Sequence, residues 1–234
     1  NRHEKEYIVK TIVTTETIKT IAERNGVEMY DVYTGFKWIA NVMRENEGKK
    51  NYIGGGEESY GFLCEDFVRD KDAVSACVIL AEIAAWAKDQ GLSLYQLLQK
   101  IYVEYGFSKE KGISVVKKGK SGAEEIEAMM KKFRENPLTE IAGSKVTYFY
   151  DYSTLKGKDY AENETVTLDM PTTSNVLQYF TEDNTKVSIR PSGTEPKIKF
   201  YCEVHSKVKS IDEVPEAEKA AEEKINQIKA SLGI

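Results

Sequence analysis

The first part of the chain combines two hydrophobic patterns. Tyr7–Val13 is rich in β-branched residues and Val27–Tyr33 alternates apolar with polar positions, which is typical of strands. Glu16–Asn25 precedes a glycine that is suited to end a helix, and Phe36–Glu47 has the apolar spacing of an amphipathic helix. Strands that alternate with helices predict an α/β domain with a mixed, mostly parallel sheet and helices beside it.

A long apolar stripe lies within Asp72–Asp89. Its members recur at helical spacing, which predicts a helix with one buried face: Ala73, Ala76, Cys77, Leu80, Ile83, Ala84 and Ala87. Ser93 is a residue type that caps helices, and a further helix follows it to about Tyr105. We expect these elements to complete a first domain at residues 1–110.

The second part of the chain has a different pattern. Glycines and lysines interrupt the periodicity of residues 106–122, so we expect a linker or an exposed connection with little strand there. Helices are predicted over Ala123–Glu135 and Glu216–Ser231. Five strands are predicted between them: Lys145–Tyr152, Thr165–Leu168, Val176–Phe180, Lys186–Arg190 and Ile198–Val204. This spacing predicts, for residues 111–234, a linker and an α+β domain with an antiparallel sheet and helices on one face.

Composition and charge narrow the class of protein. The chain has 234 residues, of which 41% are hydrophobic and 30% are charged, and this fits two globular domains and excludes global disorder. A net charge of −5 gives no general attraction to a phosphate backbone, so nucleic acid is not an expected partner. No apolar run approaches the roughly 20 residues of a membrane span, so no membrane partner is expected either.

Cysteines and histidines exclude several kinds of site. Cys64, Cys77 and Cys202 are widely spaced, which fits neither a disulfide framework nor a cluster of metal ligands. Cys77 and Cys202 lie in apolar patterns and are expected in the core. The only histidines, His3 and His205, argue against a histidine triad or a zinc site. We expect a reducing compartment, the cytoplasm.

The glycine-rich segment Gly54–Gly61 carries the first candidate chemistry. Three consecutive glycines let the backbone turn tightly and approach a ligand. Glu57 and Glu58 supply carboxylates that accept hydrogen bonds from sugar hydroxyls, and Ser59 both donates and accepts. In an extended loop Glu57 and Ser59 point together and Glu58 points away. The alternative is a surface turn with solvated acids.

The segment Arg190–Pro196 is the second candidate. Arg190 is expected on the side of its strand that faces away from the core. Its guanidinium, the hydroxyls of Ser192 and Thr194 and the backbone N–H of Gly193 together form a cradle for an anion. The alternative is a rigid hairpin turn.

The segment Thr34–Lys37 is the third candidate because it lies at a predicted helix start. Exposed N–H groups and the Lys37 ammonium attract an anion at such a position. The alternative is an ordinary surface lysine.

Three motifs taken in order carry a family resemblance. With Gly56–Gly61, Arg69–Asp72 and Arg190–Pro196, the chain resembles the α-D-phosphohexomutase superfamily, and most closely its phosphoglucomutase/phosphomannomutase branch. The resemblance covers essentially the whole chain. It implies a four-domain enzyme in which residues 1–110 are domain 3 and residues 111–234 are domain 4. The first residues read as the tail of a polar helix, and we expect the chain to begin inside a longer protein.

The resemblance also implies roles for single residues. The Gly56–Gly61 loop corresponds to the family's sugar-binding loop, in which Glu57 and Ser59 hold the O3 and O4 hydroxyls. Lys37 is implied as a further substrate-binding residue. The Arg190–Pro196 loop corresponds to the phosphate-binding loop, and the residues implied to hold the non-reacting phosphate are Arg190, Ser192, Gly193 and Thr194.

The implied activity is that of an isomerase of carbohydrate metabolism, an intramolecular phosphotransferase. It interconverts hexose 1-phosphate and hexose 6-phosphate through a phosphoserine and a hexose 1,6-bisphosphate. The family's phosphoserine loop and Mg²⁺ loop are absent from this sequence. We therefore expect no catalytic nucleophile, metal site or bound cofactor in this chain. Mg²⁺, the bisphosphate and the N-terminal domains are expected in the full-length enzyme, and the chain alone is expected to be inactive.

Two other classes remain open from the sequence. One is a non-catalytic protein that binds a phosphosugar or regulates another protein. The other is a nucleic-acid module on the C-terminal sheet, which the acidic charge disfavours. Within the enzyme class, a clamp on O3 and O4 does not reach C2, so the sequence does not choose between glucose and mannose.

Overall fold

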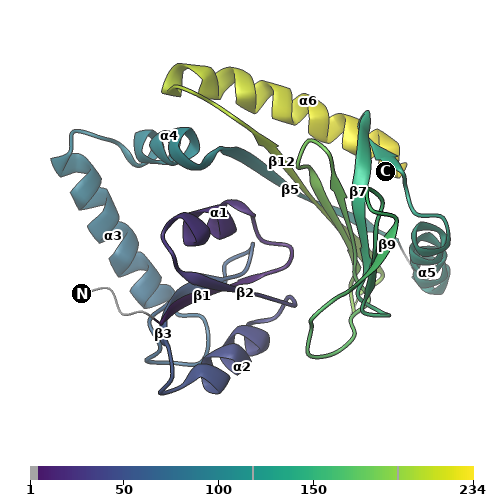
Figure 1. Ribbon diagram of the computed structural model, residues 1–234, viewed down its shortest axis with the longest axis horizontal. Helices are drawn as coiled ribbons and strands as arrows, with labels where there is room; N and C mark the ends of the chain where they lie inside the picture. The colour runs from purple at the N-terminus through teal and green to yellow at the C-terminus, as the bar shows by residue number, and fades with distance from the viewer. Residues whose placement is uncertain (1–4, 118, 194) are drawn as a thin grey trace. The chain divides into compact units, whose positions relative to one another are not determined.

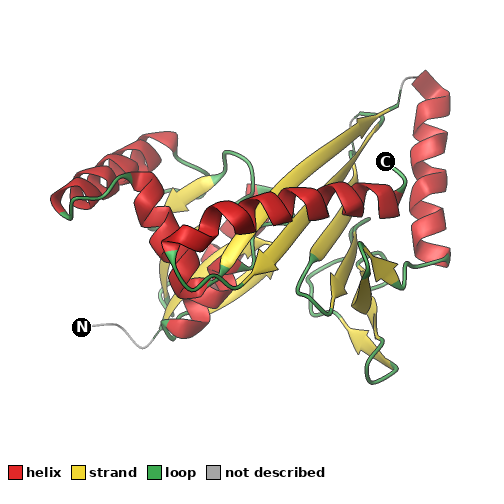
Figure 2. Cartoon of the chain, turned by 90° about the horizontal axis from the view of Figure 1, so that it is seen from above, coloured by secondary structure: helices red, strands yellow, loops and turns green. Residues whose placement is uncertain are grey.

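The structure is a computed structural model that describes residues 5–117, 119–193 and 195–234 (Figure 1). The chain divides into two compact units, residues 1–106 with 208–211 and residues 107–207 with 212–234. Each unit is built on its own sheet, and Figure 2 shows the strands in yellow.

The first unit is an α/β domain on a four-stranded sheet with the strand order β2-β1-β3-β4. β1 pairs in parallel with β2 and β3, and β4 pairs antiparallel with β3. The elements are β1 (Glu6–Thr11), α1 (Thr17–Arg24), β2 (Glu28–Val32), α2 (Phe36–Asn46), β3 (Asn51–Gly56), β4 (Phe62–Cys64), α3 (Ala73–Asp89) and α4 (Leu94–Tyr105). The predicted mixed, mostly parallel sheet is confirmed.

The core of this unit lies between the sheet and α2. Tyr7 and Val9 of β1 form one buried cluster with Phe36, Ile39 and Met43 of α2. These three α2 residues have the spacing of an amphipathic helix, and their burial fixes α2 against β1. The start of α2 therefore lies at the carboxyl ends of the parallel strands, where open α/β sheets bind their ligands.

The helix α4 begins as the sequence predicts. The Ser93 hydroxyl accepts a hydrogen bond from the Gln96 N–H at 3.2 Å. The Gln96 side chain accepts one from the Ser93 N–H at 2.8 Å, which completes a capping box. A single residue pair thus fixes this helix start.

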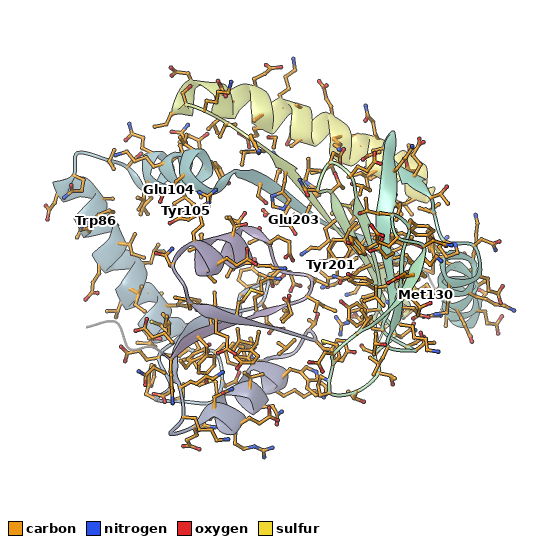
Figure 3. All side chains as sticks on the ribbon, viewed as in Figure 1. Trp86, Glu104, Tyr105, Met130, Tyr201 and Glu203 are labelled. Carbon is orange, nitrogen blue, oxygen red and sulfur yellow. The ribbon has the colours of Figure 1, made fainter. Side chains whose placement is uncertain are left out.

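The prediction of a buried stripe on α3 is wrong for most of its members. Only Ala87 is buried on this helix, and Leu80 is 55% exposed. Val74 is 74% exposed, and Trp86, which is labelled in Figure 3, is 54% exposed. The helix is apolar around most of its circumference, so periodicity did not identify a single core face. The expected burial of Cys77 is also wrong, because this thiol is exposed.

The second unit is an α+β domain on an eight-stranded sheet with the order β5-β12-β11-β10-β7-β8-β9, in which β6 pairs with β7. Its pairings are antiparallel. The elements are β5 (Phe107–Val116), α5 (Gly119–Glu135), β6 (Glu140–Ile141), β7 (Ser144–Asp151), β8 (Lys156–Asp159), β9 (Glu164–Thr167), β10 (Leu177–Thr181), β11 (Lys186–Pro191), β12 (Lys197–Ser206), a 3-10 turn (Ile211–Glu213) and α6 (Val214–Leu232). All five predicted strands and both helices are present.

The prediction of a strand-poor linker at residues 106–122 is wrong. Residues 107–116 form β5, which pairs with β12 along its whole length. Phe107, Ile113 and Val115 do alternate within this strand, but the lysines and Gly112 between them obscured the period. A strand of mixed charge at the edge of a sheet is consistent with protection against pairing with another chain.

The two faces of the second sheet differ in polarity. Ile198, Phe200 and Cys202 of β12 are buried on one face, where the Phe200 ring contacts Phe133 of α5 at 6.3 Å. α5 and α6 lie against this sheet, and Figure 1 shows α6 running along β12 and β5. Tyr201 and Glu203 alternate with these residues and project from the opposite face (Figure 3). The predicted helices on one face are confirmed, as is the burial of Cys202.

Candidate functional site

The glycine-rich segment is the tip of the β3–β4 hairpin. Gly54–Gly56 belong to β3, and the loop 57–61 connects them to β4. The Glu57 N–H donates to the Gly61 carbonyl oxygen at 2.7 Å, which closes the loop at its base. The tip is therefore a defined hairpin turn at the carboxyl end of a central strand.

Glu57 connects this hairpin to the start of α2. Its Oε1 accepts a hydrogen bond from the Gly35 N–H at 2.7 Å. Gly35 is the N-cap residue of α2, with a φ of 119°, and no side chain of its own caps this helix. A carboxylate at this position is favourable because it meets the positive end of the helix dipole. Two of the predicted segments, 34–37 and 54–61, thus meet at one hydrogen bond.

Ser59 and Glu58 do not follow the expected alternation. Residues 58–60 form a bend and Tyr60 has a φ of 54°, so the loop is not extended. The Ser59 hydroxyl approaches Glu58 Oε1 at 3.4 Å. The other oxygen of Glu58 is buried without a hydrogen-bond partner. The side-chain argument that grouped Glu57 with Ser59 and set Glu58 apart therefore does not apply to this loop.

A basic groove runs along α2 from this point. It has a volume of about 620 Å³ and is lined by four cationic side chains and one carboxylate: Lys37, Arg44, Arg69, Lys71 and Asp70. Gly35 and Phe36 also line it, so the groove reaches the N-terminal end of the helix, where backbone N–H groups have no partner within the helix. Excess positive charge beside a helix N-terminus attracts an anion.

The cations of the groove are oriented by weak contacts. Arg69 forms an ion pair with Glu47 at 2.9 Å. The Lys71 ammonium lies 3.0 Å from Asp70 and 5.8 Å from the centre of the Phe36 ring. Its hydrogen bond lowers the pKa of Asp70. Surface pairs of this kind are worth at most about 1 kcal/mol, so an anionic ligand can replace them.

The second candidate segment, Arg190–Pro196, connects β11 to β12. Backbone hydrogen bonds close it: the Ser192 N–H donates to the Lys197 carbonyl and the Lys197 N–H to the Glu195 carbonyl, both at 2.7 Å. The Ser192 hydroxyl also accepts from the Glu195 N–H at 3.3 Å. A hydrogen bond from Lys197 lowers the pKa of Glu195. Ser192 and Gly193 thus belong to this closed loop and Arg190 to the strand that leads into it, whereas the candidate Thr194 lies outside the described residues.

Lys199 is a candidate that the sequence did not single out. It is the cross-strand partner of Arg190 in the β11–β12 pairing. Cross-strand partners project from the same face of a sheet, so two cationic side chains share this end of the hairpin. Arg69 and Lys71 of the Arg69–Asp72 motif are two further cations that the sequence did not mark as site residues, and both line the groove along α2. Lys199 is identified by the strand register, and Arg69 and Lys71 are identified by the groove that they line. The spacing of residues along the sequence predicts neither feature.

A second cavity, of about 750 Å³, lies between α5 and the 191–196 loop. Pro191, Ser192 and Gly193 line it from the loop, and Met130 and Arg134 line it from α5. Arg134 is held by Asp151 at 2.9 Å and by Asn175 at 2.8 Å. Arg190 does not line this cavity, because its strand presents it to the opposite face.

These two units, one with a carboxylate loop beside a basic groove and one with an arginine loop, define the C-terminal region of an α-D-phosphohexomutase. The chain belongs to the phosphoglucomutase/phosphomannomutase family. Residues 1–105 match the family model for alpha/beta/alpha domain III, and residues 114–221 match the model for the C-terminal domain.

Similar proteins agree with this assignment. The chain is 39% identical over 207 residues to a phosphoglucomutase of Staphylococcus aureus and 36% identical over 198 residues to one of Staphylococcus haemolyticus. These matches cover 88% and 85% of the chain but only 37% and 36% of the relatives. The chain thus spans little more than a third of the length of these relatives.

Solved structures share the fold at low sequence identity. The open form of the phosphoglucomutase pp63/parafusin from Paramecium matches with a TM-score of 0.57 and 18% identity, over 97% of this chain and 38% of that one. A phosphoglucomutase/phosphomannomutase family protein from Burkholderia thailandensis matches with a TM-score of 0.53 and 16% identity, over 97% of this chain and 38% of that one.

The described residues contain no group of three or more histidine, cysteine, aspartate or glutamate side chains that could hold a metal ion. Among the same residues no helix is long and apolar enough to cross a membrane.

Proposed function

We propose that the chain is the substrate-binding, C-terminal part of a longer, cytoplasmic hexose phosphate mutase. The observation that carries the proposal is the contact between Glu57 and Gly35, two residues before Lys37. It brings a hydroxyl-binding carboxylate and an anion-binding groove to one helix start. A sugar phosphate presents hydroxyls and a phosphate on one small molecule, and this pairing of groups is complementary to it.

In this proposal the first unit holds the sugar. Glu57 accepts hydrogen bonds from the O3 and O4 hydroxyls of the ring, and Ser59 both donates to them and accepts from them. Lys37, assisted by Lys71, balances the charge of a phosphate in the groove. The two hydroxyls nearly exchange places when the sugar turns over, so one clamp serves both orientations. The clamp does not reach C2, where glucose and mannose differ.

The second unit holds the phosphate that does not react. Arg190 offers a planar fork that makes two parallel bonds to one phosphate, and Ser192, Gly193 and Thr194 add loop donors. The register of Lys199 with Arg190 adds a second charge. The closed loop reduces the conformational entropy lost on binding.

The remaining chemistry lies outside this chain. A phosphoserine elsewhere in the protein donates its phosphoryl group to the hexose monophosphate, and the resulting 1,6-bisphosphate turns over and returns its other phosphate. Mg²⁺ would be held by residues outside this chain, where it would supply positive charge to the transferring group. No described residue of this chain is assigned to Mg²⁺. These residues bind and orient the sugar phosphate, which is a large part of catalysis in phosphoryl transfer.

A titration of the 234-residue chain tests the binding roles. We expect glucose 6-phosphate to bind in the millimolar range, about −4 kcal/mol, and to shift the amide resonances of Gly35 and Gly193. Lys37→Gln is expected to weaken the first shift and Arg190→Ala the second. Glucose, which lacks the phosphate, is the control. Equal shifts with glucose, or no shift with either ligand, would contradict the proposal.

A further inference from the structure

The loop that carries Glu57 folds its side chain back over Gly61. An added Cβ at Gly61 would lie 2.9 Å from Glu57 Oε2, 3.0 Å from Glu57 Cγ and 3.1 Å from Glu57 Cβ. Real side chains essentially never approach a Cβ below 3.0 Å. The space beside Gly61 is therefore occupied by the Glu57 side chain in the conformation that reaches Gly35.

We infer that Gly61 is a positioning residue for the Glu57 carboxylate. With no side chain at position 61, the carboxylate lies where its Oε1 accepts the Gly35 N–H at 2.7 Å. The carboxylate has a second oxygen, Oε2, with which to accept a hydroxyl. Gly61 and the Gly35 N–H together hold the group in one orientation before any sugar arrives. The consequence for sugar binding rests on the proposed function, whereas the orientation itself does not.

The neighbouring glycines have a different reason to be glycine. A Cβ at Gly56 would lie 2.4 Å from the Gly61 carbonyl oxygen, and one at Gly55 would lie 2.2 Å from the Val9 carbonyl oxygen. Both conflicts are with backbone, so substitution there disturbs the sheet. The closest conflict at Gly61 is with the flexible end of the Glu57 side chain, Oε2, while the Cγ and Cβ of Glu57 have to give by only a few tenths of an ångström. Gly61 is also not among the residues with positive φ, so alanine meets no backbone strain there.

This difference makes Gly61→Ala a selective perturbation. We expect the fold to be retained because the carboxylate end of Glu57 can move away and the rest of the residue has to shift by only a few tenths of an ångström. We expect the hydrogen bond to Gly35 to be lost because the carboxylate leaves its place. Glu57→Ala removes the same bond directly. Gly112→Ala is the matched control, since a Cβ at Gly112 meets no atom within 4 Å.

The first measurement is the Gly35 amide in the ¹⁵N-labelled chain. We expect Gly61→Ala to shift this resonance and to raise its hydrogen-exchange rate as Glu57→Ala does, while Gly112→Ala leaves both unchanged. Resonances of β1 and α1 report that the fold is intact. A Gly35 amide that is unaffected by Gly61→Ala, in a folded protein, overturns the inference. This readout does not depend on enzymatic activity.

The second measurement is a double-mutant cycle on kcat/KM for hexose phosphate interconversion by the full-length protein. We expect Gly61→Ala to lower kcat/KM roughly ten- to hundredfold, which corresponds to the loss of a hydrogen bond to a charged group. In the Glu57→Ala background it is expected to cause no further loss, because it acts through that carboxylate. Additive losses indicate a merely structural role and overturn the inference. A parent protein without activity refutes the proposed function but leaves the Gly35 result decisive.

Discussion

The hairpin that carries the arginine loop contains a buried ion pair that predicts a pH dependence of stability. Lys186 of β11 and Glu203 of β12 are cross-strand partners, each 3% exposed at the side chain, and their charged atoms lie 2.8 Å apart. Glu203 also contacts His205 Nε2 at 2.7 Å. Burial raises the pKa of Glu203, but the hydrogen bond to His205 and the charge of Lys186 outweigh it and lower the pKa from 4.5 to about 2.

The magnitude and sign follow from this shift. A pKa lowered by between two and three units corresponds to about 3 kcal/mol of stabilisation by the ionised form. Because the pKa is lower in the folded state, this stabilisation is complete above the unfolded pKa of about 4.5. It is lost as the pH falls from there towards 2. Glu203→Gln removes the titration and also leaves Lys186 buried without its charge partner, which costs about 3–5 kcal/mol at neutral pH.

The assay is the free energy of unfolding by urea, measured from pH 7 to pH 2 for the parent and for Glu203→Gln. We expect the difference between the two proteins to shrink by about 3 kcal/mol between pH 5 and pH 2. Glu182→Gln, at an exposed glutamate of the turn before β11, is the control and is expected to follow the parent. A difference between parent and Glu203→Gln that stays constant over this range would refute the reasoning.

Three further predictions concern the full-length protein. Arg190→Lys is expected to weaken hexose 6-phosphate binding roughly ten- to hundredfold in calorimetry, because lysine lacks the fork; binding equal to that of the parent would leave the loop as a rigid turn only. Glu57→Gln is expected to lower kcat/KM more than Glu58→Gln, since only Glu57 contacts Gly35; equal losses would contradict this. Arg69→Gln is expected to weaken phosphate binding up to about fivefold at low salt and not at about 1 M salt, where charges are screened; a salt-independent effect would count against the groove.

Local signals in the sequence predicted most elements of both units. Ser93 caps α4 as its residue type predicts, and the strand Lys186–Arg190 begins and ends within a residue of β11. Such features depend on neighbours within a few positions, so one sequence suffices. β5 was missed because its pairing with β12 joins segments some ninety positions apart, and charged residues on its exposed side hid the alternation.

The site could be predicted only as separate segments. Thr34–Lys37 and Gly54–Gly61 were both identified, but the Gly35–Glu57 hydrogen bond joins residues 22 positions apart, and nothing in either segment specifies it. The bend at residues 58–60 overrode the alternation expected of an extended loop. Lys199 acquires its place from β-sheet register, which is a tertiary property.

The most direct test of the central claim is the conversion of glucose 1-phosphate to glucose 6-phosphate in a coupled assay with Mg²⁺ and glucose 1,6-bisphosphate. We expect the full-length protein to turn over, Arg190→Ala and Glu57→Ala to lose most of kcat/KM, and the 234-residue chain alone to give no more than the blank. Turnover by the isolated chain would contradict the assignment of the nucleophile to another part of the protein. A full-length protein that interconverts neither glucose nor mannose phosphates, or whose activity is unchanged in both variants, would contradict the account itself.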